Sequence, residues 1–476
     1  TFEGSGASMT GVAMTITPLA YNPDVNDSIV TVGTGIGITF DHRILAGSGN
    51  ITLSVATNAG AAGTTVENFG VGSSVTIAGR SVSFTPTSAL DSSETYHISY
   101  PSGSFTNTGG DVSYVGTAYT FGCRTVLTQL WMWGENENGE IGGNFVGERS
   151  SPVQVPGTTW SSVTSNGDGW SAGLRNDGTL WSWGYSDYGA LGLNQATAKY
   201  SSPTQVPGTW SKAYAGEDYM IATKADGTLW AWGENTDGEL GDNSRTRRSS
   251  PIQIGSATDW SKPVGSHDTA AAIKTDGTLY TWGDNEYGQL GVNDEIHRSS
   301  PVQVPGTTWN IVAGSPRNFA AIKTDGTLWS WGYGDVTGQN NRTTYSSPVQ
   351  IPGTTWNNVS GTYNTFLATK TDGTMWAWGR GNEGQLGVND NIPRSSPVQI
   401  PGTWSFATTY LYGGLAVKND NTLWGWGNNV YGELAQNYTN RISSPVQIGS
   451  DTDWDTTGKW KQTFGGAQTV GVIKNL

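Results

Sequence analysis

The sequence predicts an all-β protein: a seven-bladed β-propeller closed by pairing of its N- and C-terminal strands, preceded by an N-terminal immunoglobulin-like β-sandwich. Three observations support this prediction. One motif recurs seven times with a period near fifty residues, a turn signal precedes most copies, and half of a hairpin stands at each end of the repeated region. A period of this length indicates one supersecondary unit per repeat, because a single unit cannot bury its own hydrophobic face.

The repeated motif is Trp-x-Trp-Gly, which lies in an alternating apolar stretch. Its seven copies begin at Trp131, Trp181, Trp230, Tyr280, Trp329, Trp376 and Trp424, with spacings of 50, 49, 50, 49, 47 and 48 residues. Each unit also contains a Ser-Ser-Pro segment, which we place at its start, and a Pro-Gly or equivalent turn followed by Trp. Several short strands in fifty residues, without helical periodicity, are typical of a propeller blade.

A turn signal stands before most copies of the motif. It reads Asp-Gly at Asp177-Gly178, Asp226-Gly227, Asp276-Gly277, Asp325-Gly326 and Asp372-Gly373, and Asp420-Asn421 in the sixth version. Asp-Gly between apolar stretches favours a two-residue hairpin with a type I′ turn, in which both central residues have positive φ.

The two ends of the repeated region complement each other. The last segment, Val470–Leu476, matches the strand that precedes the Asp-Gly turn in other units. The first repeat begins at Gln129–Trp131, which matches the strand that follows that turn. We therefore expect these segments to pair and close a ring of seven blades over the 350 residues from Leu127 to Leu476. Closure would remove exposed strand edges.

Twenty of the 22 tryptophans fall into three columns of the repeat. Two columns are the Trp-x-Trp positions. The third follows the Pro-Gly or equivalent turn and consists of Trp160, Trp210, Trp260, Trp309, Trp356, Trp404 and Trp454; only Trp170 and Trp460 lie outside the columns. Large aromatic side chains that recur in every unit are expected to form the core. The alternative is that some rings bind a ligand or sense light.

A second, longer motif starts at the last Trp-Gly of each copy and reads Trp-Gly-x-Asn-x-x-Gly-Gln-Leu-Gly. It is best preserved as Trp282-Gly283-Asp284-Asn285-Glu286-Tyr287-Gly288-Gln289-Leu290-Gly291. Over residues 126–476 the chain resembles the regulator of chromosome condensation repeat family, a resemblance that implies a seven-bladed propeller. One departure weakens any carry-over of that family's nucleotide-exchange or chromatin-binding activity. Where the family usually has His, this chain has Trp170, Tyr219, Thr269, Asn318, Thr365, Gly413 and Thr469.

The first 125 residues differ in composition from the rest of the chain, because they contain no Trp and are rich in Thr, Ser, Gly, Val and Ile. Strand-like runs occur at Val12–Ile16, Gly37–Phe40, Ile51–Val55, Ser81–Phe84 and Tyr96–Ser99. This spacing predicts a small β-sandwich over residues 1–125, followed by the propeller over 126–476. The segments Ser83–Leu90 and Thr95–Ile98 resemble the bacterial immunoglobulin-like domain of surface-layer and phage structural proteins. That resemblance implies a spacer or docking module, with direct ligand binding as the alternative.

Composition excludes several classes of function. The formal net charge is −14 with 13% charged residues, which argues against nucleic acid as a partner, since phosphate binding is driven by Lys and Arg. The sequence contains no run of eighteen apolar residues, so it predicts no segment that spans a membrane. The single Cys123 excludes an intrachain disulfide framework. Because the chain starts at Thr1 and shows no signal peptide, we expect a processed piece.

Motifs for catalysis are largely missing from the sequence. The four histidines, His42, His97, His267 and His297, show no pair at metal-ligand spacing, and neither a nucleophile elbow nor a Walker motif is present. The loop Glu234–Glu239 has calcium-loop composition, but a turn between strands is the simpler interpretation. We therefore predict no enzymatic activity, no catalytic residue, no cofactor and no metal.

One column suggests a binding surface. The residue before each Ser-Ser-Pro is Arg149, Tyr200, Arg248, Arg298, Tyr345 and Arg394 in the first six copies, and Ile442 in the seventh. In a closed ring these side chains would form a circle, and Arg and Tyr are the residues enriched at interface hot spots. The alternative is that each side chain stacks on a tryptophan of the neighbouring blade.

These observations lead to a functional hypothesis. We expect a non-enzymatic structural or adhesive protein, extracellular on a bacterial cell surface or a phage virion, in which the sandwich spaces a propeller that binds a protein or glycan on a surface or particle, as part of a larger assembly. The alternative is a soluble inhibitor or regulator, because propellers similar to this one include an enzyme inhibitor and nucleotide-exchange factors. A light sensor is a third alternative, which lacks its expected Gly-Trp-Arg-His-Thr motif.

Overall fold

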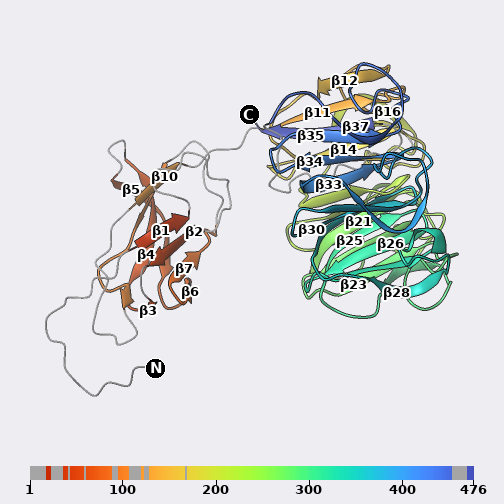
Figure 1. Cartoon of the computed structure of the whole chain (residues 1–476). Helices are drawn as coiled ribbons and strands as arrows, with labels where there is room; N and C mark the ends of the chain where they lie inside the picture. The colour runs from red at the N-terminus through yellow and green to blue at the C-terminus, as the bar shows by residue number, and fades with distance from the viewer. Residues whose placement is uncertain are drawn as a thin grey trace. The chain divides into compact units, whose positions relative to one another are not determined.

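The computed structural model describes residues 18–22, 36–40, 43–57, 61–87, 95–106, 119–122, 128–166, 169–452 and 469–475. The chain divides into two compact units, Thr1–Val126 and Leu127–Leu476 (Figure 1). Both units are built from β-strands, and the one helical element of the described ranges is the short 3-10 turn η1 (Gly334–Val336).

The N-terminal unit contains two four-stranded sheets, β1-β2-β7-β6 and β10-β8-β4-β5, and a two-stranded pair, β3-β9. The strands are β1 (Pro18–Asn22), β2 (Ile36–Phe40), β3 (Leu45–Ala46), β4 (Asn50–Ala56), β5 (Ala62–Gly70), β6 (Thr76–Ala78), β7 (Ser81–Phe84), β8 (Thr95–Ser99), β9 (Phe105–Thr106) and β10 (Tyr119–Gly122). Alternate residues of β2 and β7 are buried, including Ile38 and Val82, and both belong to one hydrophobic core. Four predicted strands are confirmed as β2, β4, β7 and β8. The predicted strand Val12–Ile16 lies outside the described residues.

In the second unit the described strands form six sheets of four strands and one sheet of three. The first strands are β13 (Trp160–Asn166), β17 (Lys212–Ala215), β21 (Trp260–Gly265), β25 (Trp309–Ser315), β29 (Trp356–Thr362) and β33 (Trp404–Tyr410). The second strands are β14 (Trp170–Arg175), β18 (Tyr219–Thr223), β22 (Thr269–Lys274), β26 (Asn318–Lys323), β30 (Thr365–Lys370) and β34 (Gly413–Lys418).

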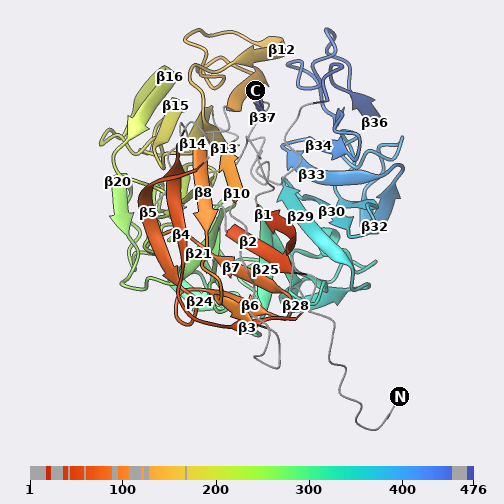
Figure 2. The same cartoon turned by 90° about the vertical axis from the view of Figure 1, so that its left-hand side faces the viewer.

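The Trp-x-Trp-Gly motif forms the third strand of each sheet. The third strands are β15 (Leu180–Ser186), β19 (Leu229–Gly233), β23 (Leu279–Gly283), β27 (Leu328–Gly332), β31 (Met375–Gly379) and β35 (Leu423–Gly427). The fourth strands are β16 (Ala198–Val206), β20 (Arg248–Gln253), β24 (Arg298–Gln303), β28 (Tyr345–Ile351), β32 (Arg394–Ile400) and β36 (Ile442–Gln447). Figure 2 shows the fourth strands following one another around the rim of the unit.

The three-stranded sheet joins the two ends of this unit. It contains β12 (Arg149–Gln154), β11 (Thr128–Gly134) and β37 (Thr469–Asn475), in the order β12-β11-β37. β11 and β37 are antiparallel, with Leu130 opposite Ile473 and Trp133 opposite Val470.

The Ser-Ser-Pro segment ends a sheet rather than starting the next one. It lies in the fourth strand, as in β20, which pairs with the preceding Trp-x-Trp strand β19. Our placement of this segment at the start of a unit was therefore wrong. Proline lacks an N–H for the ladder and is tolerated on an edge strand, so Pro251 fits the outer edge of the sheet.

The Asp-Gly hairpins differ from the predicted type I′ turn. Gly178 has φ of +79°, but Asp177 is not among the residues with positive φ. The Gly178 N–H donates to the Arg175 carbonyl at 3.0 Å, which gives a turn followed by a left-handed glycine, as in three-residue hairpins. The Asp177 carboxylate accepts the N–H of Thr179 at 2.9 Å and its hydroxyl at 2.7 Å, and these bonds hold Asp177 outside the left-handed region.

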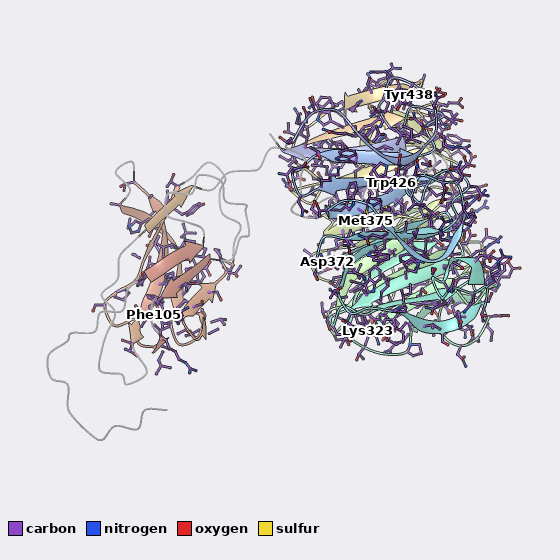
Figure 3. All side chains as sticks on the ribbon, viewed as in Figure 1. Phe105, Lys323, Asp372, Met375, Trp426 and Tyr438 are labelled. Carbon is purple, nitrogen blue, oxygen red and sulfur yellow. The ribbon has the colours of Figure 1, made fainter. Side chains whose placement is uncertain are left out.

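The second Trp column is the core that joins neighbouring sheets. All seven indoles are fully buried, as predicted, and Figure 3 labels Trp426 among the sheets. Each indole N–H donates to a backbone carbonyl of another sheet's long loop, at 2.6–3.1 Å: Trp133 to Glu433, Trp183 to Glu140, Trp232 to Ala190, Trp282 to Glu239, Trp331 to Gln289, Trp378 to Val336 and Trp426 to Gln385. Gly241 makes room for this contact, because a Cβ there would lie 2.7 Å from Trp282 Nε1.

The first Trp column is only half-buried, so the expectation that it belongs to the core is corrected. Its rings meet those of the third column edge to face, as Trp329 meets Trp309, and a cation lies against both rings. Lys323 Nζ lies 4.6 Å from the ring centroid of Trp309 and 4.5 Å from that of Trp329. The same arrangement is made by Arg175, Lys224, Lys274, Lys370 and Lys418 in the other four-stranded sheets. Third-column tryptophans are buried wherever they are described; Trp454 lies outside the described residues.

Candidate interaction face

Two sets of connections meet at one end of the sheets. Antiparallel strands alternate in direction, so the turn from first to second strand and the loop from third to fourth strand lie at the same end. Examples are the turn Ser266–Asp268 between β21 and β22 and the loop Asp284–His297 between β23 and β24. We call the surface formed by these turns and loops the loop face. The Asp-Gly and Pro-Gly turns lie at the opposite end.

A repeated backbone hydrogen bond fixes pairs of residues on the loop face. The residue after Trp-x-Trp-Gly donates its N–H to the carbonyl of a turn residue, at 2.7–3.0 Å. The six pairs are Tyr185 with Gly169, Glu234 with Asp218, Asp284 with Asp268, Tyr333 with Arg317, Arg380 with Asn364, and Asn428 with Tyr412. Since the backbone makes the bond, the fold leaves the side chains at these positions free to differ between sheets.

Two successive pairs make one half of the face acidic. Asp218, Glu234, Asp268 and Asp284 all belong to these pairs. Between them, His267 Nε2 lies 2.5 Å from a carboxylate oxygen of Glu217, and its Nδ1 lies 2.5 Å from one of Asp268. Burial lowers the pKa of His267, but its hydrogen bonds to Asp268 and Glu217 outweigh burial and raise the pKa to about 10. His267 is therefore an imidazolium that neutralises part of this cluster at neutral pH.

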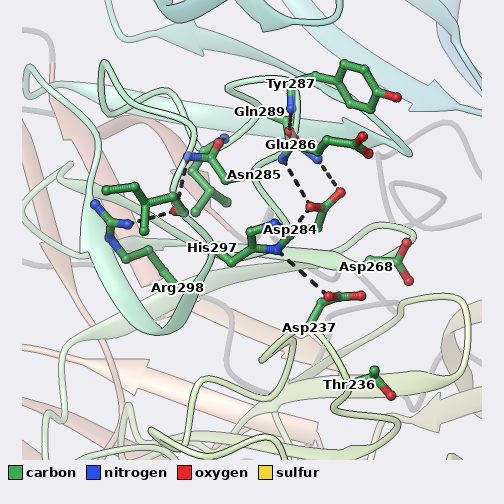
Figure 4. Close-up of polar contacts among 12 residues, drawn as sticks. Thr236, Asp237, Asp268, Asp284, Asn285, Glu286, Tyr287, Gln289, His297 and Arg298 are labelled. Atoms are coloured by element: carbon green, nitrogen blue, oxygen red, sulfur yellow. Dashed lines mark hydrogen bonds and ion pairs between the residues drawn. The ribbon is translucent and has the colours of Figure 1, made fainter.

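Figure 4 shows how the neighbouring loops contribute to the acidic half. His297 Nδ1 lies 3.2 Å from Asp284 and 3.8 Å from Asp237, and the Gln289 amide donates to the other Asp284 oxygen at 2.7 Å. Next to them the buried Glu239 caps the N–H of Asp237 at 2.9 Å. Burial, supplemented by the nearby aspartates, raises the pKa of Glu239 to about 8.

This cluster also has donors that could hold a metal ion. One ligand atom each from Glu217, His267 and Asp268 lies within 4.8 Å of the others, and so do atoms from Asp237, Glu239 and Asp268. However, both nitrogens of His267 already bond to carboxylates, and a metal ligand must be neutral imidazole. In the group of Glu217, His267 and Asp268, the protonated histidine thus supplies the positive charge that a metal ion would otherwise supply.

The other half of the face carries arginines stacked on tyrosines. Arg317 Cζ lies 4.7 Å from the ring centroid of Tyr287 and 5.9 Å from that of Tyr333. In the next sheets Arg380 Cζ lies 5.4 Å from Tyr363 and 5.9 Å from Tyr412. The Tyr363 and Tyr412 rings meet edge to face at 4.9 Å; burial, with a hydrogen bond to Tyr363, raises the pKa of Tyr412 to about 12. The Tyr412 phenol is therefore neutral at physiological pH.

A cavity of about 320 Å³ joins the two halves. Its lining is His267, Asp268, Asp284, Glu286, Tyr287, Pro316, Arg317, Tyr363 and Asn364. Asp268 and Asp284 are engaged by His267 and His297, as described above, whereas Glu286 is exposed. Two of the lining carboxylates are thus held in a fixed arrangement, and Arg317 and Glu286 are exposed charged residues of the same lining.

The predicted Arg/Tyr column lies elsewhere, on the fourth strands at the rim. Each residue stands opposite the glycine of Trp-x-Trp-Gly, as Arg248 does opposite Gly233. Its members bond to their own loops: Arg149 to the carbonyls of Gly147 and Glu148, Tyr200 to Gln195, Arg248 to Asp242, Arg298 to Asp294, Tyr345 to Asn341 and Arg394 to Asp390. Within the described ranges none of the four arginines lies over a tryptophan, so the stacking alternative does not hold for the arginines; Arg149 lies over Phe145 instead, at 4.2 Å. A binding role for this column stays a prediction.

Sequence reasoning missed the residues of the loop face. Glu217 and His267 are fifty positions apart, and only the fold brings them together. A usable signal was nevertheless present, because the position after each Trp-x-Trp-Gly changes in chemical class from Glu234 to Tyr333 to Arg380. In the part of the chain that the structure describes, no helix has the length and hydrophobicity needed to cross a membrane.

Comparison with known proteins agrees with this architecture. The regulator of chromosome condensation (RCC1) repeat matches residues 177–222, 226–272, 276–314 and 372–407, and the bacterial Ig-like domain matches residues 12–122. No curated protein shows significant sequence similarity to the chain.

Solved structures give the same picture of the fold. Human WBSCR16 is 18% identical with a TM-score of 0.63, over 73% of this chain and 99% of that one. Prp20p from Saccharomyces cerevisiae is 17% identical with a TM-score of 0.64, over 74% and 92%. Yeast RCC1 (Prp20) in its complex with Kap60 is 16% identical with a TM-score of 0.64, over 74% and 89%. The chain therefore carries regulator of chromosome condensation repeats in an RCC1-like propeller, preceded by a bacterial Ig-like domain.

Proposed function

We propose that this chain is a non-enzymatic binding protein whose propeller recognises a protein partner through the loop face. One observation carries the proposal. The backbone bond between turn and loop is the same in six sheets, but the side chains that it positions differ, and they divide into an acidic half and an Arg/Tyr half. Residues that the fold leaves free to vary, gathered on one surface, are suited to recognition.

The chemistry of the face favours binding over catalysis. Tyr and Arg supply large contact areas and are enriched at interface hot spots. These acids have structural partners, since the buried Glu239 caps a backbone N–H and His267 joins Glu217 to Asp268. The proteins of similar fold support a protein partner: Prp20p is described by its binding to Gsp1p and histones, and yeast RCC1 was solved with Kap60 bound.

The proposal includes a ring of seven blades closed by β11 and β37. Its support is the strand pairing described above, together with the Trp133 bond to Glu433, which repeats the contact between other neighbouring sheets. A closed ring would keep the loops of the face at fixed distances, and preorganised loops bind with a smaller loss of entropy.

The proposal also includes a location. We place the protein outside the cell, on a bacterial surface or a phage particle, with the Ig-like domain as spacer and the propeller as binding module. The support is analogy, from the pairing of a bacterial Ig-like domain with a propeller. Immunogold labelling of intact cells and particles with an antibody to the propeller tests this location, and label confined to the cytoplasm would contradict it.

The binding face can be tested without knowing the partner. Peptides selected from a random library on the full chain are measured against two double variants, Asp284→Asn/Tyr333→Ala on the loop face and Thr307→Ala/Thr354→Ala on exposed turns at the opposite end. We expect roughly tenfold weaker binding to the first variant and little change for the second. Equal binding to both variants, or a loss only in the second, would contradict the proposal.

A further inference from the structure

The arginines of the propeller differ in what their charged groups contact. Six described arginines are paired with carboxylates: Arg247, Arg248, Arg298, Arg342, Arg394 and Arg441. Arg317 and Arg380 contact tyrosine rings instead, and neither has an ion pair or hydrogen bond from its guanidinium to any residue that the structure describes.

Stacking positions these two guanidinium groups without using their donors. A guanidinium against a ring is held by cation–π attraction through its flat face, whereas its N–H groups point out from the edge in the plane. Arg317 is exposed and Arg380 is half-buried, so solvent reaches both. Each guanidinium thus presents a fork of two oriented N–H donors, a geometry that binds an oxyanion by donating two parallel hydrogen bonds.

The two forks belong to one surface. Arg317 and Tyr363 line the same cavity, and Tyr363 is also one of the rings that contact Arg380. Tyr363 has φ of +31° and Asn364 of +64°, in a two-residue turn between Thr362 and Thr365. Positive φ at a bulky residue is strained, and such strain is often found at functional sites. The turn places Tyr363 against Arg380 and in the lining of the cavity to which Arg317 also belongs.

The repeat itself indicates that these arginines do not serve the fold. At the turn position occupied by Arg317, the two neighbouring sheets have Asp268 and Asn364. At the position after Trp-x-Trp-Gly occupied by Arg380, the two neighbouring sheets have Tyr333 and Asn428. All make the same backbone bond. The structural requirement at these positions is therefore met without arginine.

We propose that Arg317 and Arg380 bind carboxylate groups of an acidic segment of the partner protein. The inference rests on the proposed protein-binding function and names the chemistry that this half of the face would recognise. A protein segment fits better than a nucleic acid, because two arginines on a chain of net charge −14 are too few for a phosphate backbone. The acidic half of the face orients such a segment by repelling its carboxylates toward the arginines.

A fluorescent hexaglutamate peptide and the full chain test the inference by fluorescence anisotropy. The variants are Arg317→Ala/Arg380→Ala and Arg317→Lys/Arg380→Lys, with Arg43→Ala/Arg80→Ala as the control that removes the same two charges from exposed positions of the Ig-like unit, outside the loop face. We expect roughly tenfold weaker binding to the alanine variant and several-fold weaker binding to the lysine variant, since lysine lacks the planar fork. The control is expected to bind within about twofold of the parent chain. The lysine variant keeps the test valid if the alanine variant is unstable.

Three results would overturn the inference. They are absence of hexaglutamate binding to the parent chain, equal losses in the control and the test variants, and tighter binding of a single-stranded hexanucleotide than of hexaglutamate. None of them would overturn the proposed function, because library peptides without acidic residues could still bind the loop face. Conversely, if only the Thr307→Ala/Thr354→Ala variant bound the library peptides more weakly, the proposed function would be refuted. The hexaglutamate result would not be changed by that outcome.

Discussion

Trp133 donates its indole N–H to the backbone carbonyl of Glu433 at 2.7 Å, across 300 residues of sequence. The same bond joins Trp282 to Glu239, which are only 43 residues apart. The contact between the first and last sheets of the propeller is thus the same as the contact between sheets that follow each other in the chain.

This equivalence predicts that Trp133→Phe and Trp282→Phe destabilise the protein to a similar degree. Each substitution leaves a buried carbonyl without its donor and opens a small cavity, which together cost about 1–3 kcal/mol. Denaturant midpoints of the two variants are the measurement. If Trp133→Phe had no effect while Trp282→Phe lowered the midpoint, the ring would not be closed by its ends.

The cation that lies against two aromatic rings predicts a stability effect that can be separated from packing. Lys323→Met keeps a long apolar chain but removes the charge, and we expect a loss of about 0.5–2 kcal/mol. Lys323→Arg is the control, because Arg175 occupies the same place in another sheet. Lys323→Met and Lys370→Met, on different sheets, should add within experimental error. A midpoint unchanged by Lys323→Met would show that the stacked charge contributes nothing.

Glu239 predicts a pH dependence of stability. Burial raises its pKa from 4.5 to about 8 in the folded chain, so the native state holds this proton more tightly than the unfolded state. Its contribution to stability is therefore complete below pH 4.5 and is lost as the pH rises through about 8. Glu239→Gln keeps the cap, as Gln289 does in the next sheet. The variant should match the parent at pH 4 and exceed its melting temperature at pH 8.

The control for this prediction is the exposed Glu295→Gln in the neighbouring loop. It should change the melting temperature by the same small amount at both pH values. A Glu239→Gln variant that is less stable than the parent at pH 8 would show that the carboxylate form is needed, for example to hold a cation with Asp237 and Asp268.

The Arg/Tyr column at the rim can be assigned by comparing two triple variants. Arg248→Ala/Arg298→Ala/Arg394→Ala removes the arginines, and Asp242→Asn/Asp294→Asn/Asp390→Asn removes their ion-pair partners. We expect both to lose about 1–2 kcal/mol and to bind library peptides alike, because each pair holds a loop. Weaker binding of the arginine variant alone would make the column a contact surface.

The architecture followed from the sequence because its signals are repeated. Trp282 stands in a column whose members all need burial, and seven copies of one pattern outweigh the uncertainty of any single strand. The errors were local. The type I′ turn at Asp177-Gly178 failed because the Asp177 carboxylate bonds to Thr179, a side-chain effect that the dipeptide alone does not reveal. β5 was missed because most of its residues are exposed and show no alternation.

The site was less predictable, for a physical reason. Residues that serve the fold recur, as Lys323 and its equivalents do, whereas those of the loop face differ from sheet to sheet and resemble ordinary loop residues. Their arrangement depends on distances between sheets. The stacking of Arg317 on Tyr287 leaves no spacing that a sequence pattern could detect. The fifty residues between Glu217 and His267 are one repeat period, which every column of the repeat shares.

Hydrogen exchange of the full chain, with and without a bound library peptide, tests the central claim most directly. The account predicts slower exchange in the turns and loops of the loop face, above all at Arg317–Asn318, Tyr363–Thr365 and the loop after Gly283, with no change at the Asp-Gly turns. Slower exchange confined to those turns, such as Thr324–Thr327, or to the Ig-like unit, would show that the loop face is not the binding surface.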